Sequence, residues 1–153
     1  MEKIETILLA EDNPDDVFLM RRALCKANNS AHVHVVQNGA EAIDYLAGTG
    51  IYANRVQHPK PSILILDIKM PKTSGLEVLE WLRNHLDFQV IPTIVMSASE
   101  IADDVTASYR LGANTFFMKP SSFDELVRLL ITFENYWKIA KRPAKTVSRR
   151  QSS

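Results

Sequence analysis

The sequence predicts a doubly wound α/β domain built on a five-stranded parallel sheet, with strand and helix alternating five times as (βα)5. Five short apolar runs, each followed by a segment with helical periodicity, are the basis of this prediction. Most of these runs are apolar at every position, which predicts strands buried on both faces between two helical layers. The 153 residues fit one domain, and 46% of them are hydrophobic, enough for a sizeable core.

The five apolar runs have the length and the β-branched or aromatic content of strands. Each is followed by a helix rather than by a tight turn, so successive strands are expected to run parallel, joined by helical crossovers. The expected strands are Thr6–Ala10, Val33–Val36, Ser62–Leu66, Thr93–Met96 and Thr115–Met118.

Helix start and stop signals lie between the runs. Asn13 can cap the first helix with Pro14 in its first turn, and Gly48 ends the second. Ser122 and Glu125 have the spacing of a capping box at the start of the last helix. The expected helices are residues 14 to about 28, 40–46, 76 to about 85, 102–111 and 122–139.

Two segments depart from this regular pattern. Residues 48–62 join the second helix to the third strand through an unusually long connection, which predicts a surface loop, either functional or a tolerated insertion. Residues 141–153 carry five Lys/Arg and no acid, whereas residues 1–140 carry 13 basic and all 18 acidic residues. We therefore expect one domain over 1–140 and a disordered, solvated basic tail over 141–153.

Composition excludes several classes of protein. Eighteen basic residues balance eighteen acidic ones, so no overall charge indicates direct binding to nucleic acid or to an anionic membrane. The apolar runs are too short to span a membrane and the N-terminus lacks a signal-peptide pattern, which favours a cytoplasmic protein. Cys25 is the single cysteine, so neither a disulfide framework nor a thiolate metal cluster is expected.

Polar side chains follow the predicted strands at the points where the strands end. Glu11 and Asp12 follow the first strand, Asp67 the third, Ser97 the fourth and Lys119 the fifth. Ligands of parallel α/β sheets bind beyond the carboxyl ends of the strands. A single acid there is usually a helix cap, but this convergence predicts a functional site.

Three carboxylates at one sheet edge repel one another, by about 4 kcal/mol for a pair at close range and an effective dielectric near 20. A divalent cation removes that cost, and oxygen-only ligands indicate Mg²⁺ rather than zinc. Lys119 and Ser97 can bind phosphate oxygens, so the site is suited to phosphoryl transfer. There is no glycine-rich phosphate loop, which leaves one of the carboxylates as the nucleophile.

Four motifs in chain order resemble the receiver domain of bacterial two-component response regulators, which has a flavodoxin-like fold. The resemblance covers residues 5 to about 138. The motifs are Ala10-Glu-Asp-Asn13, Leu66-Asp-Ile-Lys-Met-Pro71 followed by Gly75, Met96-Ser-Ala98, and Leu111-Gly-Ala113 followed by Met118-Lys-Pro120.

The resemblance implies that Asp67 accepts a phosphoryl group from a sensor histidine kinase. It also implies that Glu11, Asp12, Asp67 and the main-chain carbonyl of Lys69 surround Mg²⁺. Ser97 corresponds to the switch hydroxyl, Phe116 to the switch aromatic and Lys119 to the site lysine of the family. Phe116 has no hydroxyl, so the hydrogen bond that a tyrosine at this position would form is impossible here.

The long loop 48–62 and the aromatic end of the last helix narrow the resemblance. They are similar to features of the stand-alone regulators that pair with cyanobacterial phytochrome histidine kinases, which implies a phytochrome-type kinase as partner. Nothing in the sequence indicates that this chain itself binds a chromophore.

Other function classes fit the residues less well. A Mg²⁺-dependent aspartyl-phosphate phosphohydrolase is the main alternative, but it needs a second Asp two residues after the nucleophile, where this chain has Lys69. A flavin carrier would have its phosphate repelled by Glu11 and Asp12. We therefore expect a signalling switch and not an enzyme with substrate turnover.

The last helix carries two apolar stripes, although a helix packed on a sheet needs only one. The second stripe is rich in aromatic residues and predicts a homodimer strengthened by phosphorylation, with Phe133 and Trp137 at its centre. The alternative is that the end of the helix folds back over the domain. The predicted interface residues are Leu126, Leu129, Phe133, Tyr136 and Trp137.

Overall fold

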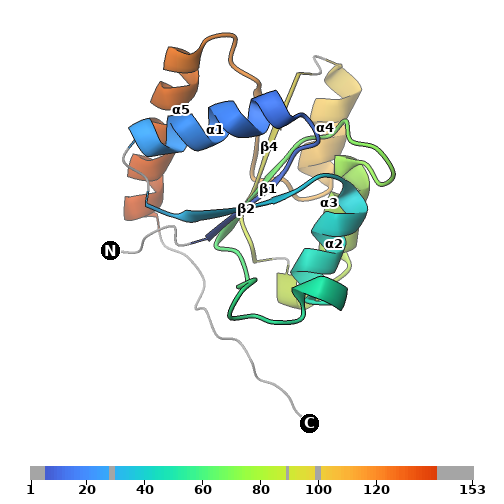
Figure 1. The fold of residues 1–153 in the computed structure, drawn as a ribbon. Helices are drawn as coiled ribbons and strands as arrows, with labels where there is room; N and C mark the ends of the chain where they lie inside the picture. Colours follow the sequence, from blue (N-terminus) through green and yellow to red (C-terminus); the bar gives the residue numbers. More distant parts are fainter. Residues whose placement is uncertain (1–5, 28–29, 89, 99–100, 141–153) are drawn as a thin grey trace.

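A computed structural model of the chain describes residues 6–27, 30–88, 90–98 and 101–140. Strands and helices alternate along these residues (Figure 1). The strands are β1 (Thr6–Ala10), β2 (His32–Val36), β3 (Ile63–Leu66), β4 (Thr93–Ser97) and β5 (Thr115–Met118). The α-helices are α1 (Pro14–Lys26), α2 (Gly39–Ala47), α3 (Gly75–Arg83), α4 (Ala102–Arg110) and α5 (Phe123–Ile139), and the short 3₁₀ helices are η1 (Gly50–Tyr52) and η2 (Leu86–Phe88).

All pairs of neighbouring strands are parallel, and the strand order in the sheet is β2-β1-β3-β4-β5. The chain moves outward from β1 to β2, then crosses back to β3 on the other side of β1 and continues to β5. This topology confirms the predicted doubly wound, flavodoxin-like fold. The reversal places β1 and β3 side by side. The connection that leaves the carboxyl end of β1 runs toward β2, whereas the one that leaves β3 runs toward β4 on the opposite side.

The sheet separates two hydrophobic cores. Helices α1 and α5 cover one face, and α2, α3 and α4 cover the other (Figure 1). Successive residues of β3 alternate between the cores, with Leu64 and Leu66 facing the α2–α4 side and Ile63 and Ile65 the α1–α5 side. This alternation confirms that the fully apolar runs are strands buried on both faces.

Most element boundaries lie within two residues of the expected ones. Strand β2 begins one residue earlier, at His32, and β4 extends to include Ser97. The short helix η2 was not anticipated, since a single 3₁₀ turn has no hydrophobic periodicity to detect. No described helix is both long and apolar enough to cross a bilayer. The predicted basic tail, 141–153, lies outside the described residues.

The long connection between α2 and β3 is fastened to the end of α2. Gly48 adopts a left-handed conformation with φ 72° that ends the helix. The guanidinium of Arg55 then donates hydrogen bonds to the carbonyls of Tyr45 and Leu46, both at 2.7 Å, and to that of His58 at 3.0 Å. Arg55 thus adds hydrogen bonds to carbonyls at the end of the helix, of which that of Tyr45 also accepts from the amide of Gly48 at 3.1 Å.

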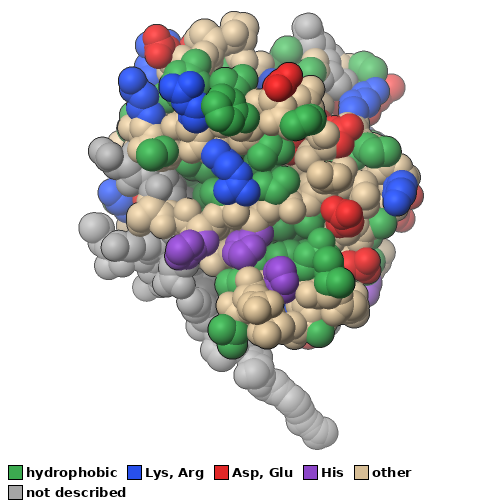
Figure 2. All heavy atoms as spheres, viewed as in Figure 1, with side chains coloured by type: hydrophobic (Ala, Val, Ile, Leu, Met, Phe, Trp, Pro, Cys, Tyr) green, Lys and Arg blue, Asp and Glu red, His purple; other side chains and the backbone are tan. Residues whose placement is uncertain are grey.

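An aromatic cluster lies between the same loop and strand β2. The His58 ring is 5.8 Å from Tyr45, 5.1 Å from Tyr52 and 6.1 Å from His34. Histidine side chains gather on this face of the molecule (Figure 2). Burial lowers the pKa of His34, and the neighbouring His58 and His32 lower it further. The loop is therefore a packed part of the domain.

Candidate functional site

The acidic residues of the site follow the two central strands, and the sheet itself brings them together. Ala10 pairs with Leu66 in the last rung between β1 and β3, so Glu11 and Asp67 come next to each other. The amide of Asp67 donates to the carbonyl of Ala10 at 3.1 Å, which extends the ladder by one residue. Ligand oxygens of Glu11, Asp12 and Asp67 all lie within 4.8 Å of one another.

The start of α1 orients Glu11. The Asn13 side chain caps the helix by accepting hydrogen bonds from the amides of Asp15 and Asp16, at 2.8 and 3.3 Å. The amide of Asn13 in turn donates to Oε2 of Glu11 at 3.2 Å. Glu11 and Asp67 are buried, whereas Asp12 is exposed.

Lys119 reaches the acids from the edge strand β5. Its amide donates to the carbonyl of Ser97, the last residue of β4, at 2.9 Å, which continues the pairing of the two strands one residue beyond the end of β5. Its ammonium lies 2.8 Å from Oε1 of Glu11, 3.2 Å from Oδ2 of Asp67 and 2.7 Å from Oδ2 of Asp16. Ser97 itself is fully buried at the end of β4.

The charged groups of the site shift one another's pKa. Burial raises the pKa of Glu11 and the charge of Asp67 raises it further, against the opposing effect of Lys119. Burial would lower the pKa of Lys119, but hydrogen bonds to Asp16 and Glu11 and the charge of Asp67 together raise it. The carboxylate repulsion at Glu11 is therefore only partly relieved by the lysine, and a cation at the triad would relieve it further.

The response regulator receiver domain family matches residues 7–131 of the chain. The chain belongs to this family. It is a receiver and not a conventional enzyme, as the sequence analysis predicted.

The receiver is similar to several known proteins along most of its length. Response regulator Rcp1 of Synechocystis sp. is 31% identical over 87% of this chain and 88% of its own. The solved Mn²⁺-bound form of Rcp1 has a TM-score of 0.81 at 30% identity, covering 92% of this chain and 99% of that one. This relative therefore holds a divalent ion in its crystal structure.

Two further solved structures come from phytochrome-associated regulators. The phosphorylated cyanobacterial phytochrome response regulator RcpA has a TM-score of 0.83 at 32% identity, covering 92% of this chain and 99% of RcpA. The bacteriophytochrome response regulator AtBRR has a TM-score of 0.73 at 34% identity, covering 95% and 100% of the two chains.

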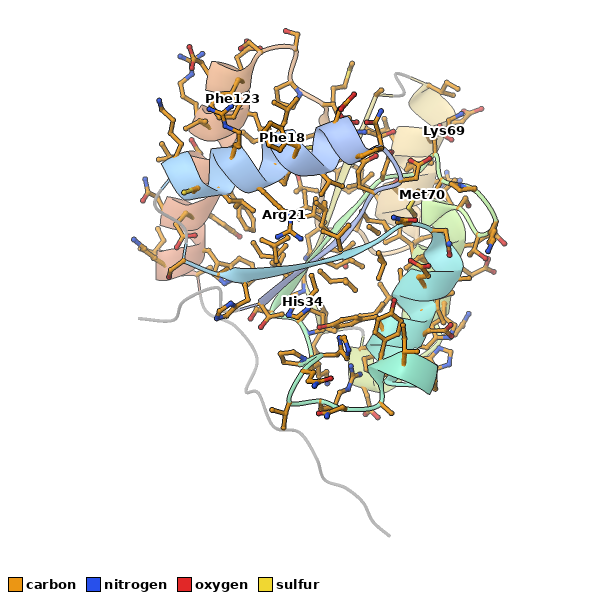
Figure 3. All side chains as sticks on the ribbon, in the orientation of Figure 1. Phe18, Arg21, His34, Lys69, Met70 and Phe123 are labelled. Carbon is orange, nitrogen blue, oxygen red and sulfur yellow. The ribbon has the colours of Figure 1, made fainter. Side chains whose placement is uncertain are left out.

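The loop that follows Asp67 in the receiver is held at both ends by glycines. The amide of Gly75 donates to the carbonyl of Ile68 at 3.0 Å, and that of Gly39 donates to the carbonyl of Thr73 at 2.9 Å. A Cβ on either glycine would overlap the loop backbone. Within the loop, the amide of Lys69 donates to Oδ1 of Asp67 at 3.3 Å (Lys69 is labelled in Figure 3).

Phe116, the expected switch aromatic, is half-buried against the core on the α2–α4 side. Its amide donates to the hydroxyl of Tyr109 on α4 at 3.1 Å. The Phe116 side chain cannot form a hydrogen bond, and the sequence carries no signal for this bond from its backbone amide. Tyr109 thereby links α4 to the free edge of β5.

The structure corrects the expected dimer stripe on α5. Leu126 and Trp137 are buried within the chain, Trp137 to 5% exposure, so these two residues are not available to the predicted dimer interface. Leu129 and Phe133 are half-buried against the same core, and of the five predicted residues Tyr136 alone is exposed, at 60%. The reason is that α1 packs beside α5, so α5 buries one stripe on the sheet and another on α1.

Asp16 is the site residue that the sequence analysis missed. Two acids in the first turn of a helix are explained by the helix dipole, so nothing in the pattern distinguished Asp16 from Asp15. The contact of Asp16 with Lys119 depends on the tertiary arrangement of β5, which the periodicity of α1 does not indicate.

Proposed function

We propose that this receiver takes a phosphoryl group on Asp67 in a histidine-kinase phosphorelay that requires Mg²⁺. The observation that supports this most directly is the position of the Asp67 carboxylate. It is buried at the end of the central strand β3, belongs to the acidic triad and contacts the ammonium of Lys119. A carboxylate in this setting can act as a nucleophile beside the positive charge of Lys119.

The residues present fit a hard divalent cation. The triad offers oxygen ligands without a nearby histidine or cysteine among the described residues, which favours Mg²⁺ over zinc. We propose Glu11, Asp12, Asp67 and the carbonyl of Lys69 as its ligands. A bound Mg²⁺ would reduce the repulsion between these carboxylates and the incoming phosphoryl oxygens.

The proposed transfer forms one bond and breaks one. An Oδ atom of Asp67 attacks the phosphorus of a phosphohistidine, the phosphorus–nitrogen bond breaks, and the leaving imidazole keeps the electron pair. Lys119 donates hydrogen bonds to the phosphoryl oxygens, where negative charge is concentrated in the transition state and afterwards.

The same contacts supply a switch. A phosphoryl group on Asp67 adds oxygens that Lys119 and the Ser97 hydroxyl can approach, and these residues end β5 and β4. Because the Lys119 amide is bonded to the Ser97 carbonyl, the two strand ends are expected to move together. Phe116 and its Tyr109 contact would transmit the change to the surface formed by α4, β5 and α5.

We propose a phytochrome-type histidine kinase as the donor. RcpA and AtBRR, both named as phytochrome-associated regulators, support this pairing because they match the receiver along more than nine-tenths of its length. The Arg22 guanidinium lies 5.7 Å from the ring of Phe18 on α1 and 5.5 Å from the ring of Phe123 on α5 (both phenylalanines are labelled in Figure 3). Phe18 and Arg22 are exposed on α1, and we propose that a donor protein approaches over them.

The direct test is incubation of the purified protein with acetyl phosphate, followed by intact-mass analysis. We expect the gain of one phosphoryl group in the presence of Mg²⁺ and none after the metal is removed with EDTA. Restoring Mg²⁺ should restore the gain. Equal phosphorylation with and without the metal would contradict the proposed role of the triad.

We also propose that phosphorylation strengthens a homodimer, now centred on the exposed side of α5. Tyr136 and Ile139 are 60% and 83% exposed there. We expect sedimentation to show more dimer after treatment with acetyl phosphate, and Tyr136→Asp to stay monomeric. Ile131 is also exposed and lies five residues before Tyr136, about 140° around the helix from Tyr136 and about 80° from Ile139, so Ile131→Asp is the matched control. A monomeric wild type under all conditions would exclude the dimer.

A further inference from the structure

The ammonium of Lys119 uses its full hydrogen-bonding capacity on carboxylates. A lysine has three N–H donors, and three carboxylate oxygens lie within 3.2 Å of Nζ. Two of them belong to Glu11 and Asp67, which are members of the acidic triad. The third and nearest, at 2.7 Å, belongs to Asp16, which is not a member.

Two cations therefore depend on the same acids. A metal ion at the triad and the ammonium of Lys119 both need the oxygens of Glu11 and Asp67. Asp16 is the carboxylate that can hold the lysine without taking part in metal binding. Its contact is also partly shielded from solvent, with the Asp16 side chain 35% exposed and that of Lys119 22%.

The start of α1 fixes Asp16 in this position. The side-chain oxygen of Asn13 accepts a hydrogen bond from the amide of Asp16, and the amide of Asn13 donates one to the carboxylate of Glu11. Asn13 thus positions both Glu11 of the triad and Asp16, and both of these acids contact Lys119. Asp15, its neighbour in the same turn, is exposed and makes no contact with Lys119.

We propose that Asp16 is a positioning residue that anchors Lys119 and so keeps Glu11 and Asp67 accessible to the metal ion. The inference rests on the proposed function, because it assigns Asp16 a part in preparing that same site. Without the Asp16 carboxylate, the ammonium settles on the two triad acids and competes with the metal. With it, the lysine stays beside Asp67 while the triad binds its ion.

The test measures metal binding without any phosphoryl donor. Mn²⁺ is titrated into the protein and free Mn²⁺ is followed by electron paramagnetic resonance, for wild type, Asp16→Asn and Asp15→Asn. Both substitutions remove one negative charge from the same helical turn. We expect the Mn²⁺ dissociation constant to rise about fivefold to tenfold for Asp16→Asn, the size of effect that one ordinary hydrogen bond has, and less than twofold for Asp15→Asn.

A second pair of variants shows whether Asp16 acts through the lysine. In a Lys119→Gln background, Asp16→Asn should change Mn²⁺ affinity no more than Asp15→Asn does. Equal shifts for the two Asp variants, or an Asp16 effect that persists without Lys119, would overturn the inference while leaving the proposed function intact. Failure of the wild type to bind Mn²⁺ would overturn both.

Discussion

Asp67→Asn is expected to abolish phosphorylation. The amide is nearly isosteric with the carboxylate, so the fold should persist, but it lacks the charge and nucleophilicity needed to attack phosphorus. We expect no mass gain with acetyl phosphate and Mg²⁺, and no transfer of label from an autophosphorylated phytochrome-type kinase. Among the described carboxylates, only Asp67 and Glu11 combine burial, membership of the triad and contact with Lys119. Glu11 is therefore the one other carboxylate that could accept the phosphoryl group in this variant.

Asp87→Asn is the matched control for this experiment. Asp87 is exposed in η2 and is not part of the triad, so the Asp87→Asn variant should gain one phosphoryl group as the wild type does. If Asp67→Asn still gained one phosphoryl group, Asp67 would not be the acceptor, and peptide mapping of the modified residue would show whether Glu11 had replaced it. Transfer from acetyl phosphate but not from the kinase in the wild type would contradict the proposed donor.

Gly75→Ala is expected to destabilise the protein by about 2–4 kcal/mol, as judged from the cost of overpacking a rigid site. The added Cβ would lie 2.8 Å from Cα of Ile68 and closer still to the carbonyl oxygen of Asp67. Both are backbone atoms, so the loop after Asp67 must shift. Helix propensity alone predicts the opposite sign, a stabilisation of up to about 1 kcal/mol.

Urea unfolding at equilibrium measures this change. Gly39→Ala should have a comparable effect, because its Cβ would overlap Thr73 at the other end of the same loop. Gly50→Ala is the control, since nothing lies within 4 Å and its cost is limited to a left-handed backbone with φ 60°, about 1–2 kcal/mol. A stabilised Gly75→Ala would show that the loop is not tightly clamped.

The fold was predictable because its signals are local. Runs such as Ile63–Leu66 are too apolar for any place but the centre of a sheet, and caps such as Asn13 and Gly48 mark helix ends directly. The carboxyl ends of parallel strands meet at one edge, so the meeting of Glu11, Asp12 and Asp67 follows from strand order alone.

The parts that were not predictable depend on packing between distant segments. The two stripes of α5 are visible in sequence, but only the position of α1 shows that Trp137 is covered within the same chain. The contact of Asp16 with Lys119 joins residues 103 positions apart. The hydrogen bond from Phe116 to Tyr109 uses a backbone amide, which carries no sequence signal at all.

The anchoring of the long loop by Arg55 has a consequence for local unfolding. Because the guanidinium occupies the last carbonyls of α2, the helix end and the loop cannot open separately without losing the same hydrogen bonds. The fifteen residues that look like a tolerated insertion therefore form one cooperative unit with α2. Amide exchange at the end of α2 would report the opening of this unit, and cleavage near Val56 would loosen a helix that supports the edge strand β2.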